Sequence, residues 1–122
     1  MFVSFLSFDQ DKNKTSFQSE AKQNDNEIIF EDKSCPNTNI KISFLKDSFI
    51  LERFGSTEMF MQFCLDKPTK GTYKNADGLE FEFMVQTKTL TMDKNKVKVC
   101  YDMVMDQEVI STLTFQVVLF EN

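Results

Sequence analysis

Apolar and polar residues alternate along most of the second half of the chain. From residue 79, alternate positions are apolar and the positions between them are polar, as in Leu79, Phe81, Phe83 and Val85 against Glu80, Glu82, Gln86 and Lys88. The same alternation recurs from Val97 to Met105 and from Val109 to Leu119. Successive side chains of a strand point to opposite faces, so this period indicates half-buried strands. The last segment becomes apolar on both faces near its end, which predicts a strand with two neighbours.

The first half of the chain contains shorter segments of the same kind. We predict strands at residues 2–8, 15–21, 27–31, 39–45, 49–54, 57–65 and 71–75. Clusters of Asn, Asp, Ser, Gly and Pro separate these segments, as is typical of strands joined by tight turns. No segment carries the apolar stripe of a long helix. The chain is therefore predicted to be all-β and to form a single domain over residues 1–122.

The predicted architecture is one antiparallel, up-and-down β-barrel of about 8 to 10 strands. Short turns favour the pairing of each strand with the next one along the chain. An open sheet of this kind would expose the backbone groups of its two edge strands, and closure removes both edges. For this reason a barrel is favoured over a sandwich.

Composition narrows the functions that this fold could carry. The chain has 122 residues, no His, and 14 Lys and Arg against 19 Asp and Glu, for a net charge of −5. Without His, an imidazole base, a Ser–His or Cys–His pair and a His-ligated metal are all excluded. We therefore expect a protein that is not an enzyme and that uses no cofactor or metal. The acidic balance provides no basic surface for a phosphate backbone, so nucleic acid is not an expected partner.

The cysteines and the first residues bear on the compartment. Cys35, Cys64 and Cys100 are three in number and lie far apart in the sequence. An odd count without Cys-x-x-Cys spacing indicates free thiols in a reducing cytosol. The apolar start of the chain, residues 1–8, is interrupted by Ser4 and Ser7 and lacks a basic region, so it is interpreted as a strand and not as a secretion signal. No apolar run approaches the ~20 residues of a membrane span, and we expect a cytoplasmic protein with no membrane association.

A series of single residues in the middle and later parts of the chain has a distinctive order and spacing. It comprises Arg53-Phe54-Gly55, Met59, Met61, Phe63, Gly71-Thr72-Tyr73, Gly78, Thr87, Leu90 and Tyr101. Over residues 37–120 this series resembles the YwiB-like family of uncharacterised bacterial proteins. The resemblance implies a calycin-like barrel, related in shape to lipocalins and fatty-acid-binding proteins, and implies no biochemical activity. True lipocalins carry a Gly-x-Trp motif, and this chain has no Trp.

Arg53 is the first candidate binding residue. It is the only arginine, and alternation places it on the same strand face as Phe49 and Leu51. If that face is internal, the guanidinium could hold a ligand carboxylate or phosphate inside the barrel. The structural alternative, which we favour, places Arg53 at a strand end, where it pairs with a carboxylate such as Glu80 or Glu82 or extends over Phe side chains to water, because an unpartnered buried charge is costly.

Tyr73 and Tyr101 are the other two candidates for ligand binding. Each phenol could donate a hydrogen bond inside a pocket, but we predict that both lie at the rim of the barrel with their hydroxyls in water. Fourteen Phe and seven Met supply ample volume to fill the interior. The expected interior is therefore packed or nearly packed.

Two acidic groups are interpreted as surface features. Glu80 and Glu82 share a strand face that alternation assigns to solvent. The Asp9, Asp11 and Asn13 cluster has the spacing of a calcium loop but lacks its Gly and distant Glu, so it is predicted to be a polar turn.

Two functions remain open from the sequence. The first is a non-catalytic barrel that binds a small apolar or amphipathic ligand, with Arg53, Tyr73 and Tyr101 as polar contacts. The second is a solid-core interaction protein that binds a protein partner through its outer surface or a strand edge. The sequence does not indicate an oligomeric state.

Overall fold

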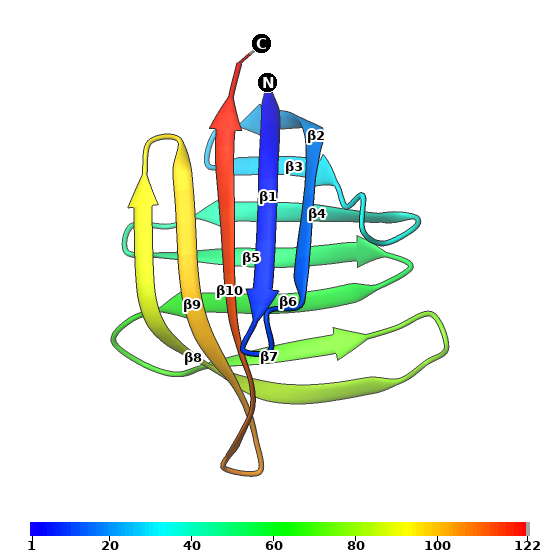
Figure 1. Ribbon diagram of the computed structural model, residues 1–122, viewed down its shortest axis with the longest axis vertical. Helices are drawn as coiled ribbons and strands as arrows, with labels where there is room; N and C mark the ends of the chain where they lie inside the picture. The colour runs from blue at the N-terminus through cyan, green and yellow to red at the C-terminus, as the bar shows by residue number, and fades with distance from the viewer. Residues whose placement is uncertain (122) are drawn as a thin grey trace.

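The computed structural model describes residues 1–121 and consists of strands joined by short turns (Figure 1). The strands are β1 (Phe2–Asp9), β2 (Lys14–Asn24), β3 (Glu27–Glu31), β4 (Thr38–Phe44), β5 (Ser48–Gly55), β6 (Glu58–Cys64), β7 (Thr69–Lys74), β8 (Glu80–Asp93), β9 (Lys96–Met105) and β10 (Glu108–Phe120). Each strand pairs antiparallel with the next, and β10 pairs with β1 to close the barrel. The predicted all-β, calycin-like barrel is confirmed, as is the prediction that the last strand has two neighbours.

The strands of the barrel run in two directions. In Figure 1 the strands β3 to β7 lie crosswise to β1, β9 and β10. Two long strands connect these parts. β8 bends where its register with β9 shifts between Thr87 and Thr89, and β2 pairs with β1 up to Glu20 but with β3 from Ala21 onward. The bulge in β8 lets that strand turn the corner between the two sheet directions.

Aromatic side chains fill the centre of the barrel. The ring of Phe63 lies 4.9 Å from Phe49, 4.9 Å from Tyr101 and 5.4 Å from Phe115, measured between centroids. Phe49 and Phe63 are fully buried. Burial of one such side chain stabilises the fold by about 1.5–3 kcal/mol, and paired rings add about 0.5–1.5 kcal/mol. This cluster joins strands β5, β6, β9 and β10 through the interior.

Threonine hydroxyls of β7 and β8 bond to the backbone of β6 beyond the end of its ladder with β7. The paired residues of these strands end at Phe60 and Thr72. Beyond them, the hydroxyl of Thr69 donates to the carbonyl of Gln62, and the amide of Cys64 donates to the hydroxyl of Thr87 over 3.2 Å. Both threonines are buried, and their hydroxyls provide partners for one carbonyl and one amide of β6.

One predicted inward position is wrong, and a second apolar residue is also exposed. Leu79 and Val109 are each 56% exposed, and alternation placed Leu79 on the apolar face of its strand. Leu79 lies in the turn before β8, where its amide bonds to the Asn75 side chain. Val109 lies at the tip of the β9–β10 hairpin, where the register shifts between Val109 and Ser111. Leu79 precedes its strand and Val109 precedes a register shift within β10, so the period of two does not decide the orientation of either side chain.

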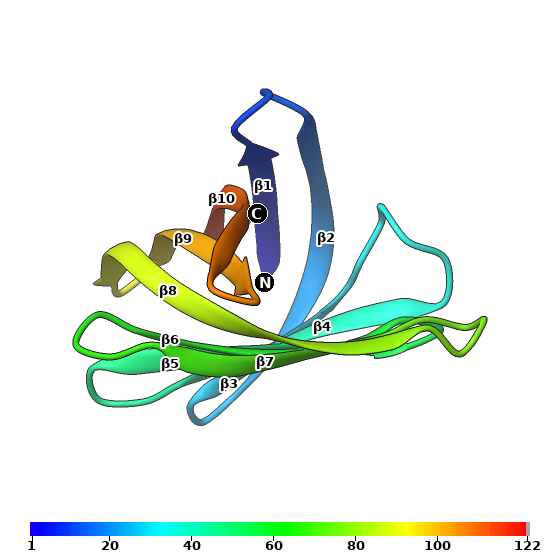
Figure 2. The same ribbon diagram turned by 90° about the horizontal axis from the view of Figure 1, so that it is seen from below.

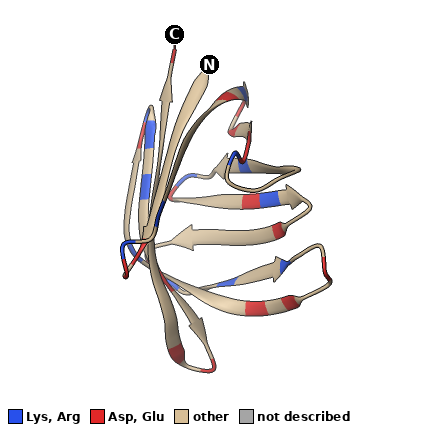
Figure 3. Ribbon diagram, turned by 45° about the vertical axis from the view of Figure 1, so that its right-hand side comes forward, with Lys and Arg blue, Asp and Glu red and all other residues tan. Residues whose placement is uncertain are grey.

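Charged residues of both signs are intermixed on the ribbon, as Figure 3 shows. The predicted surface positions of Glu80 and Glu82 are confirmed, because both side chains are exposed and Glu82 forms an ion pair with Lys70. The predicted polar turn at Asp9 is also confirmed. Its carboxylate accepts hydrogen bonds from the amide of Asp11 and from the amide and side chain of Asn13.

Gly71 allows β7 to approach the ring of Phe83 on β8. A Cβ added at Gly71 would lie 2.6 Å from the Phe83 Cζ. The variant Gly71→Ala must displace this buried ring, so we expect its free energy of unfolding to fall by about 1–3 kcal/mol in chemical denaturation. The neighbouring exposed substitution Thr72→Ala should stay within about 0.5 kcal/mol of the parent protein. If Gly71→Ala and Thr72→Ala have equal effects, the close approach to Phe83 does not constrain the barrel.

Candidate functional site

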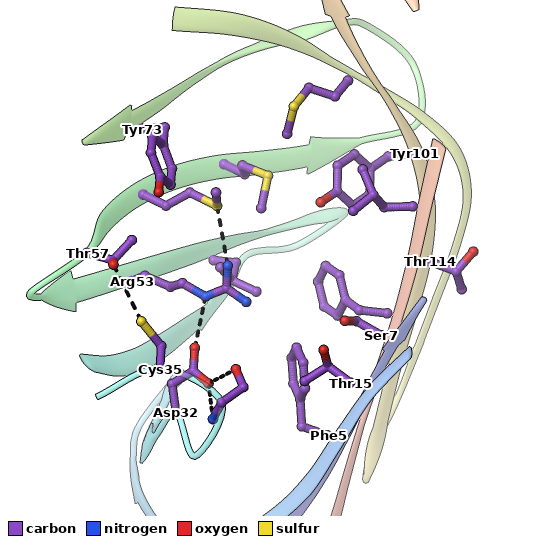
Figure 4. Close-up of a pocket in the computed structure, with 17 residues that line it drawn as sticks. Phe5, Ser7, Thr15, Asp32, Cys35, Arg53, Thr57, Tyr73, Tyr101 and Thr114 are labelled. Atoms are coloured by element: carbon purple, nitrogen blue, oxygen red, sulfur yellow. Dashed lines mark hydrogen bonds and ion pairs between the residues drawn. The ribbon is translucent and has the colours of Figure 1, made fainter. Parts of the chain in front are cut away.

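A cavity of about 390 Å³ lies inside the barrel toward the turns β1–β2, β3–β4 and β5–β6. Its apolar wall includes Phe5, Leu51, Met61 and Phe115, and its polar groups include Arg53 and Asp32. The expectation of a packed interior is therefore correct for the aromatic centre and wrong for this end. The side chains that surround the cavity come from strands far apart in the sequence (Figure 4).

Arg53 lies on the inner face of β5, as its alternation with Phe49 and Leu51 predicts. The expected pairing of Arg53 with Glu80 or Glu82 is wrong, because both glutamates lie on the exposed face of β8. The partner is Asp32, whose Oδ2 lies 3.2 Å from the Arg53 Nε. Asp32 follows β3 two residues after the buried Phe30, so the inward side of that strand continues into the turn.

The Asp32 carboxylate is held by its own turn. Its side chain is only 1% exposed. Oδ1 accepts hydrogen bonds from the Ser34 amide, over 2.9 Å, and from the Ser34 hydroxyl. The carboxylate is therefore held by contacts that do not involve Arg53, and the ion pair joins the β3–β4 turn to β5 (Figure 4).

The ion pair leaves part of the Arg53 guanidinium free for another group. The Nε and the Asp32 Oδ2 are close, but neither atom has a hydrogen bond, so the attraction is electrostatic and not directional. Nη1 makes a 3.9 Å contact with the weak acceptor Met59 Sδ. The Arg53 side chain is 25% exposed and lines the cavity. A planar guanidinium in this position can bind a carboxylate or phosphate through its outer nitrogens.

Tyr101 and Tyr73 both line the cavity, but the predicted rim position is wrong for Tyr101. Tyr101 is 4% exposed and packs against Phe63 within the aromatic cluster. Its hydroxyl points toward the cavity in Figure 4. Burial raises the pKa of the Tyr101 phenol to about 12, and the nearby Arg53 charge lowers it only in part. Tyr73 is half-buried, with its ring 5.0 Å from that of Phe81.

Two turns supply cavity residues that the sequence did not identify as site residues. Asp32, Ser34 and Cys35 come from the β3–β4 turn, and Thr57 comes from the β5–β6 turn. The thiol of Cys35 lies 3.5 Å from the Thr57 hydroxyl. Asp followed two residues later by Ser is typical of a side-chain-capped turn, but nothing local indicates that such a turn faces the barrel interior.

Within residues 1–121, the cysteines and acidic residues singled out from the sequence do not form a second candidate site. All three cysteines are free, as predicted. The Cys64 thiol donates to the Asp66 carboxylate, and this hydrogen bond raises the pKa of the thiol. Within residues 1–121, no group of His, Cys, Asp and Glu has the arrangement of a metal site. Over the same residues there is no helix with the length and hydropathy to cross a lipid bilayer.

Comparison with known proteins identifies a family and one similar fold. The family model described as "Domain of unknown function (DUF1934)" matches residues 6–117. The crystal structure of the ywiB protein from Bacillus subtilis is similar, with a TM-score of 0.59 and 16% sequence identity. The match covers 98% of this chain and 89% of that chain. No curated protein matches the sequence. The resemblance to the YwiB-like family is thereby confirmed, and the structural match supports the fold.

The ion pair generates an expectation about stability. The variant Arg53→Met leaves the Asp32 carboxylate buried without its counterion, and we expect the free energy of unfolding to fall by about 3–5 kcal/mol. The double variant Asp32→Asn with Arg53→Met removes both charges and should recover most of this loss. Urea denaturation of the parent, the single variants and the double variant measures the coupling. Additive effects of the two substitutions would contradict the pairing.

Tyr101 generates an expectation about pH. The folded protein retains the Tyr101 proton up to a pKa of about 12, whereas an unfolded tyrosine has a pKa of 10.0. Between these values the folded state binds more protons, so this residue makes stability fall as pH rises from about 10 to about 12. Denaturation of the parent and of Tyr101→Phe across this range should show a smaller decline in the variant. Parallel curves for the two proteins would show that Tyr101 does not titrate differently on folding.

Proposed function

This chain belongs to the DUF1934 family, and we propose that its barrel is a non-catalytic module that binds a small amphipathic molecule with an anionic group. The observation that supports the proposal most directly is an apolar cavity with the Arg53 guanidinium on its wall. Asp32 lies near the Nε of this group, and the outer nitrogens remain for another partner. Ligand pockets of proteins have volumes of about 300–1,000 Å³ and combine an apolar lining with a few polar groups, and this cavity has both properties.

The polar groups in the cavity divide into two roles. Arg53 is the cation that meets the anionic group of the ligand, and the Tyr101 and Tyr73 hydroxyls donate hydrogen bonds to the same group. Asp32 positions the guanidinium and keeps the empty cavity electrically neutral, which lowers the cost of a cation among apolar side chains. An anion bound to the outer nitrogens is closer to Arg53 than to Asp32, so the net interaction is attractive.

The apolar part of the ligand contacts a flexible wall. Met59, Met61 and Met103 line the cavity together with Leu51 and Leu113. Methionine side chains adapt their shape at low cost, so this wall suits an alkyl or aromatic group of variable outline. A non-catalytic role agrees with the absence of His from the sequence.

The proposed compartment is the cytoplasm. The three cysteines are free, and two of them, Cys35 and Cys64, have thiols that contact polar side chains without bonding to another sulfur. Half-buried free thiols are most compatible with a reducing environment.

Isothermal titration with a matched pair of probes tests the proposal. Decanoate and decanol have the same alkyl chain, and only decanoate carries an anionic group. We expect decanoate to bind the parent protein and to bind the Asp32→Asn/Arg53→Met double variant at least about tenfold more weakly. Decanol binding should be the same for both proteins. The double variant is used because it leaves no unpaired buried charge.

A variant that fills the cavity provides the control for location. Leu113→Trp adds volume to the cavity wall and should weaken both probes, provided that its folding is verified by circular dichroism. If neither probe binds the parent protein, or if the double variant loses both probes equally, the anionic-ligand proposal is wrong.

A further inference from the structure

Part of β2 has a backbone edge that the closed barrel leaves without a strand partner. Residues 14–20 of β2 pair with β1, and pairing with β3 begins only at Ala21. Among the described residues, no strand pairs with residues 14–20 on the side away from β1. In Figure 2 the β1–β2 hairpin diverges from the turn between β3 and β4. An edge of this kind is a template for another strand.

The direction of each backbone group along this edge follows from one hydrogen bond. The amide of Ala21 donates to the carbonyl of Met1 over 2.9 Å, so Ala21 bonds toward β1. Residues in an antiparallel pair alternate between bonding toward one neighbour and toward the other. The backbone groups of Ser16, Gln18 and Glu20 therefore point away from β1, toward the free edge. The Glu20 carbonyl already accepts the Ser19 hydroxyl, so Ser16 and Gln18 are the open positions.

The side chains on the outer face of the same edge are polar and exposed. They are Lys14, Ser16, Gln18 and Glu20, whereas the intervening Thr15, Phe17 and Ser19 are partly or fully buried. The four outward residues carry one positive charge at one end and one negative charge at the other. This segment is therefore complementary to itself when it is reversed.

We propose that two copies of this chain pair antiparallel through the free edge of β2. The two-fold axis passes between the two Phe17 residues, so that Ser16 of each copy lies opposite Gln18 of the other. The same register places each Lys14 directly opposite Glu20 of the second copy, on the outer face. Directly opposed residues in an antiparallel pair have Cβ atoms about 4.5–5.5 Å apart, which is within reach of an ion pair. The second copy continues the sheet at the point where β3 turns away.

Other pairings of this edge are less favourable. A shift of the register by two residues in one direction places Lys14 opposite Lys22 of the second copy. A second uncovered edge lies at the start of β8, where Glu80 and Glu82 precede the first residue paired with β9, Met84. Pairing of β2 with that edge brings Glu20 near two further carboxylates, and pairing of the β8 edge with itself brings four carboxylates together. Like charges in directly opposed positions destabilise a strand pair.

Sedimentation velocity over a concentration series tests the proposal with charge-swap variants. The parent protein should form a reversible dimer. Lys14→Glu and Glu20→Lys each place like charges together at both ends of the interface, and each should weaken the dimer by about tenfold. The Lys14→Glu/Glu20→Lys double variant restores opposite charges in the same register, and its dimer should return to within about threefold of the parent. Both residues are exposed, so the monomer fold is not expected to change.

A proline variant tests the backbone contribution independently of charge. Gln18→Pro removes an amide that points to the free edge and makes no bond to β1, so it should abolish the dimer while the circular dichroism spectrum is retained. Ser19→Pro is the matched control, because it removes an amide directed at β1 and should destabilise the barrel itself. A parent protein that is monomeric at all concentrations would overturn the proposal. A dimer that survives Gln18→Pro, or that the double charge swap fails to restore, would do the same.

Discussion

The change of partner along β2 and β8 is the constraint from which the rest of this structure follows. A barrel that consisted of straight strands with one neighbour throughout on each side would bring its walls together evenly. Here β8 bends at Thr87–Thr89 and β2 leaves β1 for β3 at Ala21, so the two halves of the sheet run in different directions. The walls approach closely over the aromatic cluster and separate toward the β3–β4 turn. The cavity and the free edge of β2 are both products of this separation.

The ion pair between Arg53 and Asp32 lowers the free-energy cost of placing charged groups at the end of the barrel where the walls separate. An arginine among Phe, Leu and Met side chains would be costly without a counterion, and the same is true of a carboxylate with a 1% exposed side chain. Because the carboxylate is held by Ser34 and meets only the Nε of the arginine, the charges compensate without using all of the guanidinium donors. A site of this construction balances its charges internally and leaves the outer guanidinium nitrogens for the ligand proposed above.

The sequence predicted the fold well because the strand period is local information. Each strand was located from the alternation of its own residues, and closure followed from the cost of free edges. The errors lie where that local rule ends. Leu79 is in a turn and Val109 lies beside a register shift at the start of β10, and the burial of Tyr101 depends on Phe63 and Phe115 from other strands. The partner of Arg53 was missed because Asp32 is separated from it by 21 residues and is oriented by a turn.

The two proposed activities are physically separable because they use opposite faces of one strand. Thr15 of β2 lines the cavity, whereas Lys14 and Ser16 on either side of it face outward. A change of charge at Lys14 or Glu20 therefore leaves the polar groups of the cavity in place, and a change at Arg53 leaves the free edge intact.

Any communication between ligand and second copy must pass through the backbone of β2 itself. That strand is held by β1 on one side over residues 14–20, so pairing of its free edge would restrict its motion and with it the position of Thr15. A dimer that binds ligand more tightly than its monomer would be the signature of such coupling, and equal affinities would show that β1 alone fixes the strand.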